Sequence, residues 1–319
     1  MGMNALAVVL QRPQQIVLSR LELIEPQACD VVVEVDFSGI STGTEKLLWN
    51  GRMPSFPGMG YPLVPGYEAV GRVVEAGPTS GRRVGERVFV PGARCFGEVR
   101  GLFGASASRL VVAGERAVPL FDQIGEEAIL LALAATAYHA VAGGGRRREV
   151  HPPELIVGHG VLGRLLARMT VAGGYPAPTV WETDPVRSSG ACGYEVIRPE
   201  DDKRRDYRAI YDVSGDALII DRLVARLAPG GEIVLAGFYS DPLAFSFAPA
   251  FMREATIRAA AEWKPADMLA VRELVGSGVL ALDGLITHHA GAEQAEGAYR
   301  TAFSDQACLK MVLDWRSLH

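Results

Sequence analysis

Two polar side chains stand side by side on a predicted turn in the segment PGYEAVGRVVEAG, residues 65–77. Proline and glycine favour a turn there, and an apolar run typical of a strand follows. Tyr67 and Glu68 are residue types that hold a metal, move a proton or only brace the turn. Upstream, the segment STGTEK (residues 41–46) adds hydroxyl, carboxylate and ammonium groups suited to proton transfer. For Glu45 and Glu68 we favour the interpretation that they accept backbone N–H bonds that fix their turns.

A glycine-rich motif indicates a dinucleotide site. In ELIVGHGVLGRLLARM, Gly158, Gly160 and Gly163 form G-x-G-x-x-G between a predicted strand and a predicted helix. The first glycine permits the tight turn, the second lets backbone approach a pyrophosphate, and the third lets the helix pack on the strand. Free N–H groups at the helix N-terminus then face the phosphates, so Val161 and Leu162 join the predicted cofactor residues.

The next predicted strand ends in an acid, Glu182, 19 residues after Gly163. An acid at that spacing is expected to bind the adenosine ribose hydroxyls, and its charge would repel the extra phosphate of NADP. We therefore predict NAD as the cofactor, with Asp184 as the competing acid and Arg187 as a further cofactor contact.

Two later strands end at the carboxyl edge of the predicted sheet, where ligands of such sheets bind. Ser214, its neighbour Gly215, and Gly237 follow these strands. We predict that they lie against the nicotinamide half of the cofactor, and the alternative is that they only turn the chain.

The predicted secondary structure changes near residue 125. Before it, short apolar runs (residues 31–37, 69–77, 86–90 and 108–113) alternate with glycine- and proline-rich turns, which predicts an antiparallel barrel or sandwich. After it, the sequence predicts helices at 125–144, 161–174, 217–231 and 266–280, and strands at 154–158, 179–183, 207–215, 232–238 and 307–315. That alternation favours a parallel sheet with helices on both faces.

The composition excludes several function classes. A formal net charge of −5 argues against a general nucleic-acid binder, which needs a basic face. No apolar window reaches the ~18 residues of a membrane span, and the first residues lack the features of an export signal. We therefore expect a soluble, cytoplasmic protein. The four cysteines are far apart in the sequence, so neither a disulfide framework nor a structural zinc site is expected.

The order of these parts resembles the medium-chain dehydrogenase/reductase superfamily, the group of zinc alcohol dehydrogenases and quinone reductases. The matching segments cover nearly the whole chain; they are SGISTGTE (38–45), PGYEAVGRVVEAG (65–77), GERVFV (85–90), TAYHAV (136–141), the glycine turn and APGGEIVLAGF (228–238). The resemblance implies an α/β protein with two domains. A GroES-like β-barrel catalytic domain would comprise residues 1–122 and 263–319, and a Rossmann dinucleotide-binding domain residues 123–262.

One branch of the superfamily is more similar still. The run from residue 41 to 77 and the segment VWETD (180–184) resemble the branch that acts on bacteriochlorophyll precursors. This resemblance implies a porphyrin-type substrate and an NAD-dependent oxidation of a ring-bound 1-hydroxyethyl group to acetyl.

Zinc-bearing relatives place a cysteine, a histidine and a second cysteine at positions that match Ser41, Tyr67 and Ala132. Those three residues do not make a Zn²⁺ site, which requires thiolate, imidazole or carboxylate ligands. Glu68 is retained, but one carboxylate cannot hold the ion, and the cysteine-rich loop of structural zinc is missing. We predict no bound metal, with Cys95 or a histidine brought near by folding as the open alternative.

Alcohol oxidation without a metal needs a general base or a hydrogen-bond relay. Lys46 stands near the place where zinc relatives keep a proton-relay histidine. Ser41 and Thr44 can relay a proton through their hydroxyls, and Tyr67 can hydrogen-bond the developing oxyanion. These four are the predicted catalytic residues, although Lys46 is equally consistent with an exposed lysine and Tyr67 with a packing residue.

The segment WNGRMPSFPGMGY (49–61) is too rich in proline and glycine to be predicted as a helix or regular strand. Its apolar side chains either tuck under the barrel or form a flat wall for a porphyrin-type macrocycle. The resemblance favours the wall, and Arg52 would then pair with a propionate carboxylate. The predicted wall consists of Trp49, Met53, Phe56, Met59 and Tyr61.

Two other functions stay open at this point. A zinc-free quinone or enone reductase is one, although most of these prefer NADPH and Glu182 argues against that. A nucleotide-binding redox sensor without catalysis is the other, and the lost zinc positions fit it. The resemblance also implies a homodimer that pairs through the last strand of the nucleotide domain, around residues 256–263.

Overall fold

The structure is a computed structural model that describes residues 2–142, 150–260 and 262–319. Contacts divide the chain into two compact units. Unit 1 comprises Met1–Ala132 and Leu285–His319, and unit 2 comprises Leu133–Gly284. The predicted domain boundaries, after residues 122 and 262, stay a prediction.

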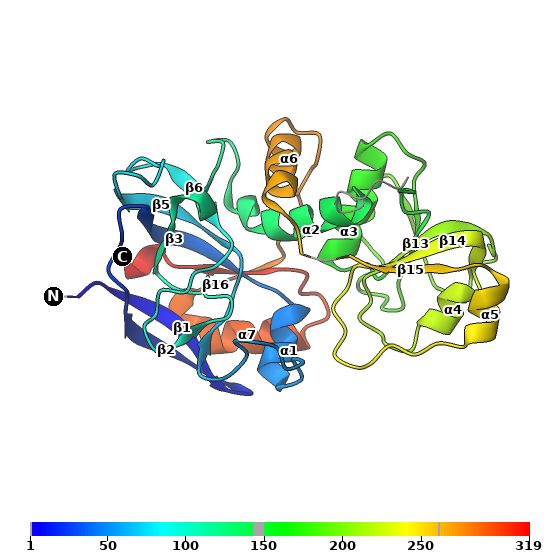
Figure 1. Cartoon of the computed structure of the whole chain (residues 1–319), viewed down its shortest axis with the longest axis horizontal. Coiled ribbons are helices and arrows are strands. Elements are labelled where there is room, and N and C mark those ends of the chain that lie inside the picture. The colour runs from blue at the N-terminus through cyan, green and yellow to red at the C-terminus, as the bar shows by residue number, and fades with distance from the viewer. Residues whose placement is uncertain (1, 143–149, 261) are drawn as a thin grey trace. The chain divides into compact units, whose positions relative to one another are not determined.

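Unit 1 is mainly antiparallel β-structure. One sheet has the strand order β2-β1-β4-β7, and the other has the order β16-β17-β3-β5-β6-β9, with β8 also paired to β3. Figure 1 labels β1 and β2 of the first sheet and β3, β5, β6 and β16 of the second. Its strands are β1 (Asn4–Arg12), β2 (Gln15–Glu22), β3 (Asp30–Ile40), β4 (Leu63–Val64), β5 (Ala69–Ala76), β6 (Arg87–Val90), β7 (Arg100–Gly101), β8 (Arg109–Ala113), β9 (Val118–Pro119), β16 (His288–Gly291) and β17 (Met311–Asp314). The helices α1 (Thr44–Asn50) and α7 (Ala295–Ser304) complete it, with short 3₁₀ turns that include η2 (Glu126–Leu130).

The long strand β3 is the centre of unit 1. It pairs with β5, β8 and β17, all antiparallel. Four of its valines are fully buried, because β-branched side chains suit a strand covered on both faces. The tail strand β17 beside β3 brings residues from the end of the chain against residues 37–40.

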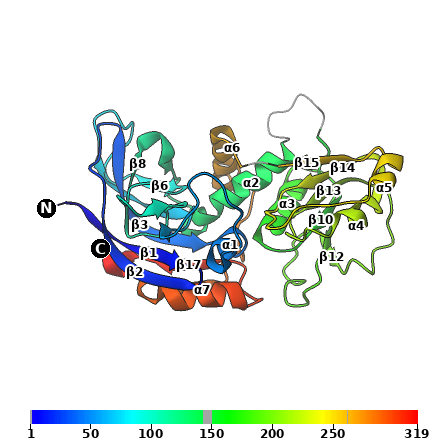
Figure 2. The ribbon, with the colours of Figure 1, turned by 60° about the horizontal axis from the view of Figure 1, so that its bottom comes forward.

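Unit 2 is a six-stranded parallel sheet with the order β12-β11-β10-β13-β14-β15, whose strands run side by side in Figure 2. Its strands are β10 (Leu155–Val157), β11 (Thr179–Trp181), β12 (Glu195–Ile197), β13 (Tyr207–Asp212), β14 (Leu227–Leu235) and β15 (Thr256–Ala259). Its helices are α3 (Val161–Ala172), α4 (Ile220–Val224), α5 (Phe247–Met252) and α6 (Pro265–Gly276), and α2 (Leu131–Val141) crosses the division between the units. The α/β fold class is confirmed.

Two local predictions are wrong. The segment that begins at Trp49 was predicted to lack a helix, but α1 extends to Asn50 and includes that tryptophan, with Gly51 ending the helix at φ +69°. The predicted helix at 217–231 is only one turn and a half, α4, because its second half joins the sheet as the start of β14. The predicted helix at 125–144 begins as the 3₁₀ turn η2 and continues as α2, and its last two residues lie outside the described part of the chain.

Candidate functional site

The ends of β3 and β5 bring the first two predicted catalytic residues together. Ser41 directly follows β3, and Tyr67 precedes β5, which pairs with β3 through Ser38 and Ala69. The Tyr67 hydroxyl donates a hydrogen bond to Ser41 Oγ at 2.5 Å. Two of the three residues that the sequence matched to zinc ligands thus contact each other through their hydroxyls.

The surroundings of Tyr67 hold its ring in one place. Phe103 meets the ring edge-on, with centroids 5.6 Å apart at an angle of 83°. Gly66 before it has φ +91°, and a Cβ there would lie 2.6 Å from Ser106 Oγ, so only glycine fits this turn. Burial raises the pKa of Tyr67, whereas the hydrogen bonds of Ser41 and Thr44 act in the opposite direction. The phenol therefore stays protonated and available as a donor.

Glu45 contacts the same site from helix α1. It is fully buried in the first turn of α1, and its Oε1 accepts the backbone N–H of Ser41 at 2.9 Å. Its Oε2 accepts the hydroxyl of Tyr299, on α7, at 3.0 Å. Burial raises the pKa of this carboxyl from 4.5 to about 7. The prediction that Glu45 accepts a backbone N–H bond is confirmed.

Glu68 is held differently from the prediction. Its Oε2 lies 2.6 Å from Nζ of Lys310, just before β17, and neither side chain reaches solvent. Its Oε1 has no hydrogen-bond partner among the described residues. Burial raises the pKa of Glu68, and the ammonium of Lys310 opposes that shift. Glu68 therefore anchors the turn by an ion pair with the tail of the chain, and the predicted backbone N–H bond is wrong.

The other two predicted catalytic residues lie on α1. Thr44 is half-buried at the first helical position, and Lys46 is exposed two residues later. The protein itself does not bury Lys46, so its part in proton transfer depends on a bound substrate. The catalytic roles of all four residues stay a prediction.

The predicted macrocycle wall divides into core residues and half-buried residues. Trp49 and Met53 are buried in the hydrophobic core of unit 1, where Trp49 also packs against Phe303 at 5.9 Å between ring centroids. Phe56, Met59 and Tyr61 are only partly buried, and Arg52 is exposed. The half-buried side chains are those available to a ligand, and the assignment of the set to the substrate stays a prediction.

The glycine turn of unit 2 fits a dinucleotide on steric grounds. It runs from β10 into α3, with Gly158 at φ +104°. A Cβ on Gly163 would lie 1.9 Å from the carbonyl oxygen of Gly158, so that position must be glycine. A Cβ on Gly160 would meet nothing within 4 Å, which leaves open space in front of the backbone. The turn therefore offers N–H groups and room for a pyrophosphate, with Val161 and Leu162 opening the helix.

Glu182 follows β11 and is tied to the same turn. Its Oε2 accepts the backbone N–H of His159 at 3.0 Å, and its Oε1 accepts those of Thr183 and Asp184 at 2.7 and 2.9 Å. The acid predicted to bind the ribose thus lies beside the predicted phosphate-binding turn. The competing acid, Asp184, instead accepts the N–H of Val186.

Two further predicted cofactor residues, Ser214 and Gly237, lie at the carboxyl ends of β13 and β14, whereas Arg187 lies in the segment that follows Glu182. A Cβ on Gly158 would lie 3.3 Å from the nitrogen of Ser214, and one on Gly237 would lie 3.2 Å from Val213 Cα. Asp212, buried at the end of β13, accepts the N–H of Ser214 at 3.0 Å and the hydroxyl of Tyr239 at 2.6 Å. Burial raises the pKa of Asp212. The structure therefore brings the predicted residues of three strand ends to one edge of the sheet.

Sequence reasoning missed several members of both sites. Their chemistry depends on partners far away in the sequence, or on burial, which the local pattern does not reveal. They are Lys310, Tyr299, Asp212, Tyr239 and Arg164.

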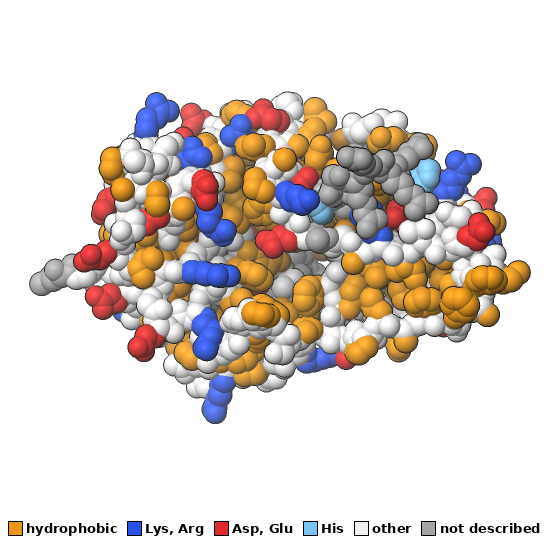
Figure 3. Space-filling view, viewed as in Figure 1, with side chains coloured by type: hydrophobic (Ala, Val, Ile, Leu, Met, Phe, Trp, Pro, Cys, Tyr) orange, Lys and Arg blue, Asp and Glu red, His pale blue; other side chains and the backbone are white. Residues whose placement is uncertain are grey.

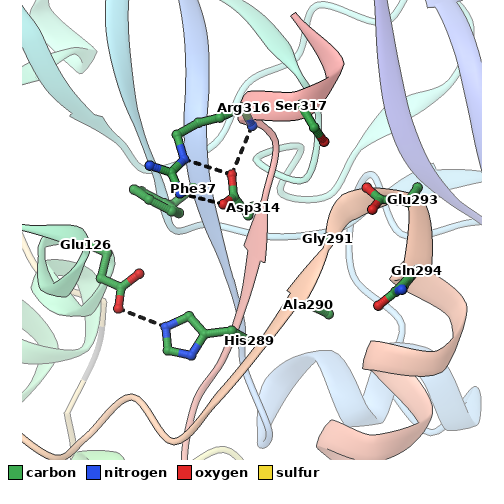
Figure 4. Close-up of a pocket in the computed structure, with 10 residues that line it drawn as sticks. All are labelled: Phe37, Glu126, His289, Ala290, Gly291, Glu293, Gln294, Asp314, Arg316 and Ser317. Carbon is green, nitrogen blue, oxygen red and sulfur yellow. Dashed lines mark hydrogen bonds and ion pairs between the residues drawn. The ribbon is translucent and has the colours of Figure 1, made fainter.

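A separate hollow of about 510 Å³ opens on unit 1 (Figure 4). His289 binds Glu126 at 2.8 Å there, and Arg316 binds Asp314 beside Phe37. The hollow lies at the far end of β17, where Asp314 pairs with Phe37, whereas Met311 pairs with Ile40 beside Ser41, and neither Ser41 nor Tyr67 lines it. It is therefore not part of the Ser41–Tyr67 site.

Metal-ligand clusters and membrane-spanning helices are both absent from the described residues. No three His, Cys, Asp or Glu side chains of residues 2–142, 150–260 and 262–319 are grouped as metal ligands. In the same part of the chain, none of the helices has the length and apolar character needed to cross a membrane.

Comparison with known proteins agrees with this geometry. Residues 27–122 match the model of the alcohol dehydrogenase GroES-like domain. A crystal structure of an alcohol dehydrogenase from Escherichia coli complexed with NADH superposes with a TM-score of 0.80, covering 98% of this chain and 100% of that one at 22% identity. A zinc-binding dehydrogenase from Sinorhizobium meliloti bound to NADP gives a TM-score of 0.81, with 98% and 99% coverage at 17% identity.

The fold and the matching domain define a medium-chain dehydrogenase/reductase, an oxidoreductase that oxidises alcohols. A much closer relative is the 2-desacetyl-2-hydroxyethyl bacteriochlorophyllide A dehydrogenase of Cereibacter sphaeroides, which is 59% identical over 99% of this chain and 99% of its own length. The chain therefore belongs to the family of bacteriochlorophyllide a dehydrogenases within that superfamily.

Proposed function

We propose that the protein oxidises the ring-bound hydroxyethyl group of a bacteriochlorophyllide to an acetyl group, with NAD as the hydride acceptor and without catalytic zinc. The observation that carries the proposal is the 59% identity over 99% of both chains to a relative whose name states this substrate. NAD, when bound, supplies the nicotinamide that accepts the hydride. The protein must then remove the hydroxyl proton.

The Ser41–Tyr67 pair is the best-placed route for that proton. The two hydroxyls are already hydrogen-bonded at 2.5 Å, and Tyr67 is a fixed donor that can stabilise a developing alkoxide. Burial raises the pKa of Tyr67, so a phenolate does not persist there, and the phenol can take up a proton only as it passes its own to Ser41 Oγ, which makes the pair a relay. Thr44 extends the relay along α1, and Lys46 at the exposed face of that helix is the candidate that passes the proton to solvent.

The contacts of the residues at the zinc-ligand positions support a zinc-free site. Ser41 and Tyr67 satisfy each other's hydroxyls, and Ala132 is a buried alanine. The nearby carboxylate Glu68 is already neutralised by Lys310. A Zn²⁺ ion placed here would find no thiolate or imidazole and would meet the buried ammonium.

NAD is favoured over NADP by Glu182. Its carboxylate sits against the glycine turn, where it can accept the ribose hydroxyls and repel a 2′-phosphate. The two structural neighbours carry one nucleotide each, NADH and NADP, so the choice rests on this acid.

A homodimer is favoured by the edge of unit 2. Strand β15 ends the sheet with one ladder open, and α5 beside it exposes Phe247, Phe251 and Met252 by 71%, 64% and 77%. Hydrophobic side chains gather over this end of unit 2 in Figure 3. A second copy that pairs along β15 would cover both the open ladder and the apolar face. We place the dimer in the cytoplasm.

The experiment that tests the function follows two absorbance bands together. Purified protein is mixed with NAD and the hydroxyethyl bacteriochlorophyllide, with and without prior chelator treatment. NADH formed in step with a shift of the macrocycle's red band is the expected result, and chelation should not change the rate. Loss of the rate on chelation would overturn the zinc-free site. Nucleotide binding with no change in either band would instead favour a non-catalytic sensor, and reduction of quinones by NADPH would favour a reductase.

A further inference from the structure

Arg164 is a buried cation inside the dinucleotide fold. It stands in the first turn of α3, directly after Gly163 of the motif, and is only 4% exposed. Its guanidinium donates four hydrogen bonds of 2.7–3.1 Å, and all four end on backbone carbonyl oxygens. Those oxygens belong to His159, Arg187, Ser189 and Gly190. Within the described part of the chain, no ion pair joins Arg164 to a carboxylate.

His159 reinforces the same connection from the turn. Its Nδ1 lies 2.7 Å from the carbonyl oxygen of Arg187, and its Nε2 lies 2.8 Å from the hydroxyl of Tyr194. Burial lowers the pKa of this imidazole to about 4, so the ring is neutral near pH 7. A neutral ring donates from Nδ1 to the carbonyl and accepts the tyrosine hydroxyl at Nε2. The backbone N–H of His159 meanwhile binds Glu182.

These contacts tie two loops that a dinucleotide must contact at once. The glycine turn faces the pyrophosphate, and the segment after Glu182 lies on the ribose side of such a site. A planar guanidinium with five donors suits several carbonyl groups at fixed angles, which an ammonium does not. A loop held in its bound conformation before the ligand arrives costs less to order on binding.

We propose that Arg164 is a cofactor-positioning residue, because its guanidinium holds the segment from Arg187 to Gly190 against the glycine turn and so prepares the ribose side for NAD rather than NADP. The inference rests on the proposed use of NAD. It adds that the choice of nucleotide depends on the support of the loop as well as on the charge of Glu182.

Gly190 gives a way to loosen this support from outside the core. It is exposed, has φ +79°, and a Cβ there would lie 2.6 Å from Nη1 of Arg164. Gly193 in the same loop has φ +77°, but a Cβ there would meet only Val171 Cγ1, at 3.6 Å. An alanine at either position therefore has the same cost of a left-handed backbone, but only the alanine at 190 would contact Arg164.

The experiment measures the dissociation constants of NADH and NADPH by nucleotide fluorescence on the intact protein, with melting temperatures recorded for each variant. For Gly190→Ala we expect NADH binding about tenfold weaker than in Gly193→Ala and a lower preference for NADH over NADPH. Arg164→Lys, which keeps the charge and loses the fork, should show the same two changes. Rescue by the lysine to wild-type values would overturn the proposal, because charge alone would then be sufficient.

Two further outcomes would also overturn it. In the first, the dissociation constants of Gly190→Ala lie within twofold of those of Gly193→Ala for both nucleotides. In the second, Gly190→Ala binds both nucleotides more weakly by the same factor, so that the preference for NADH is unchanged. These outcomes leave the wild-type preference for NADH intact and so concern Arg164 alone. If the wild-type protein binds NADPH as tightly as NADH, the proposed use of NAD itself fails.

Discussion

Lys310 Nζ lies 2.6 Å from Glu68 Oε2, and the two side chains are 1% and 0% exposed. A buried pair of this kind costs desolvation, but removal of one partner leaves a charge without compensation. For Glu68→Gln or Lys310→Met we expect a loss of about 3 to 5 kcal/mol in the free energy of unfolding. The double variant should lose less than the sum of the two. Urea unfolding followed by circular dichroism measures each.

The control for that pair is an exposed one. Arg300 and Glu296, on α7, lie 2.8 Å apart with both side chains 59% exposed. Glu296→Gln should cost less than about 1 kcal/mol, because solvent screens the pair. If Glu68→Gln and Glu296→Gln lower the free energy of unfolding equally, the Glu68–Lys310 pair is hydrated in solution.

Removal of the Tyr67 hydroxyl tests the relay. Tyr67→Phe keeps the ring against Phe103 and removes the donor to Ser41 Oγ. We expect kcat to fall about 10²-fold or more, as for loss of a proton-transfer group, with the dissociation constant of NADH unchanged. Ser41→Ala should behave in the same way. Full activity of both would exclude the pair, and a comparable fall in Lys46→Met would identify Lys46 as the terminal acceptor.

Glu45 makes stability depend on pH in a defined direction. Burial raises its pKa from 4.5 to about 7, so between these values the folded state holds a proton that the unfolded state releases. The contribution of Glu45 is therefore full below about pH 4.5, falls as pH rises to about 7 and is constant above. Glu45→Gln lacks this dependence. Its free energy of unfolding relative to that of wild type should therefore rise by on the order of 3 kcal/mol between about pH 4.5 and about pH 7.

Unfolding of both proteins at pH 5, 6, 7 and 8 measures that difference, with Glu296→Gln as the exposed control. A difference that stays constant with pH would show that the Glu45 carboxyl is hydrated. The position of Ser41 relies on the same carboxyl, so the activity of Glu45→Gln should fall even where its stability rises.

Glu182 should set the nucleotide preference through its charge. Glu182→Gln removes the repulsion of a 2′-phosphate and weakens three backbone contacts of the turn. We expect NADH binding about tenfold weaker, equivalent to about 1.4 kcal/mol, and a smaller loss for NADPH. Fluorescence titration with both nucleotides measures the ratio. If Asp184→Asn changes the ratio and Glu182→Gln does not, the competing acid is the ribose ligand.

The apolar face of α5 should respond to charge. Phe251→Glu, alone or with Phe247→Glu, places a carboxylate where a second copy would bury it. The dissociation constant of the proposed dimer should therefore rise. Sedimentation velocity over a concentration series measures this. Val84→Glu is the matched control, since Val84 is 66% exposed on unit 1. Wild-type protein that remains monomeric throughout the series would exclude the dimer.

Local patterns made part of this structure predictable. The strand, glycine turn and helix from Leu155 to Ala172 follow from spacing alone, since each glycine has its own steric reason. The valine-rich strand β3 is similarly plain. The helix predicted at 217–231 failed because Leu227 pairs with Tyr207 at the start of β14, and a tertiary ladder overrides an apolar run with helical spacing.

The partners in both sites could not be predicted in the same way. Glu45 and Glu68 were expected to serve only their own turns, yet their partners Tyr299 and Lys310 lie 254 and 242 residues further along the chain. Arg164 looks like a surface arginine of an amphipathic helix until the loop after Glu182 is folded over it. Long-range burial decides these roles, and a single sequence carries no local sign of it.

The long separation of Glu68 and Lys310 has a consequence for biosynthesis. The ribosome makes Glu68 242 residues before the lysine that neutralises it, and the whole of unit 2 is made in between. A nascent chain can therefore complete its nucleotide-binding sheet while Glu45 and Glu68 still await Tyr299 and Lys310. Until those last partners emerge, the proposed Ser41–Tyr67 site lacks the contacts of Glu45 with Tyr299 and of Glu68 with Lys310.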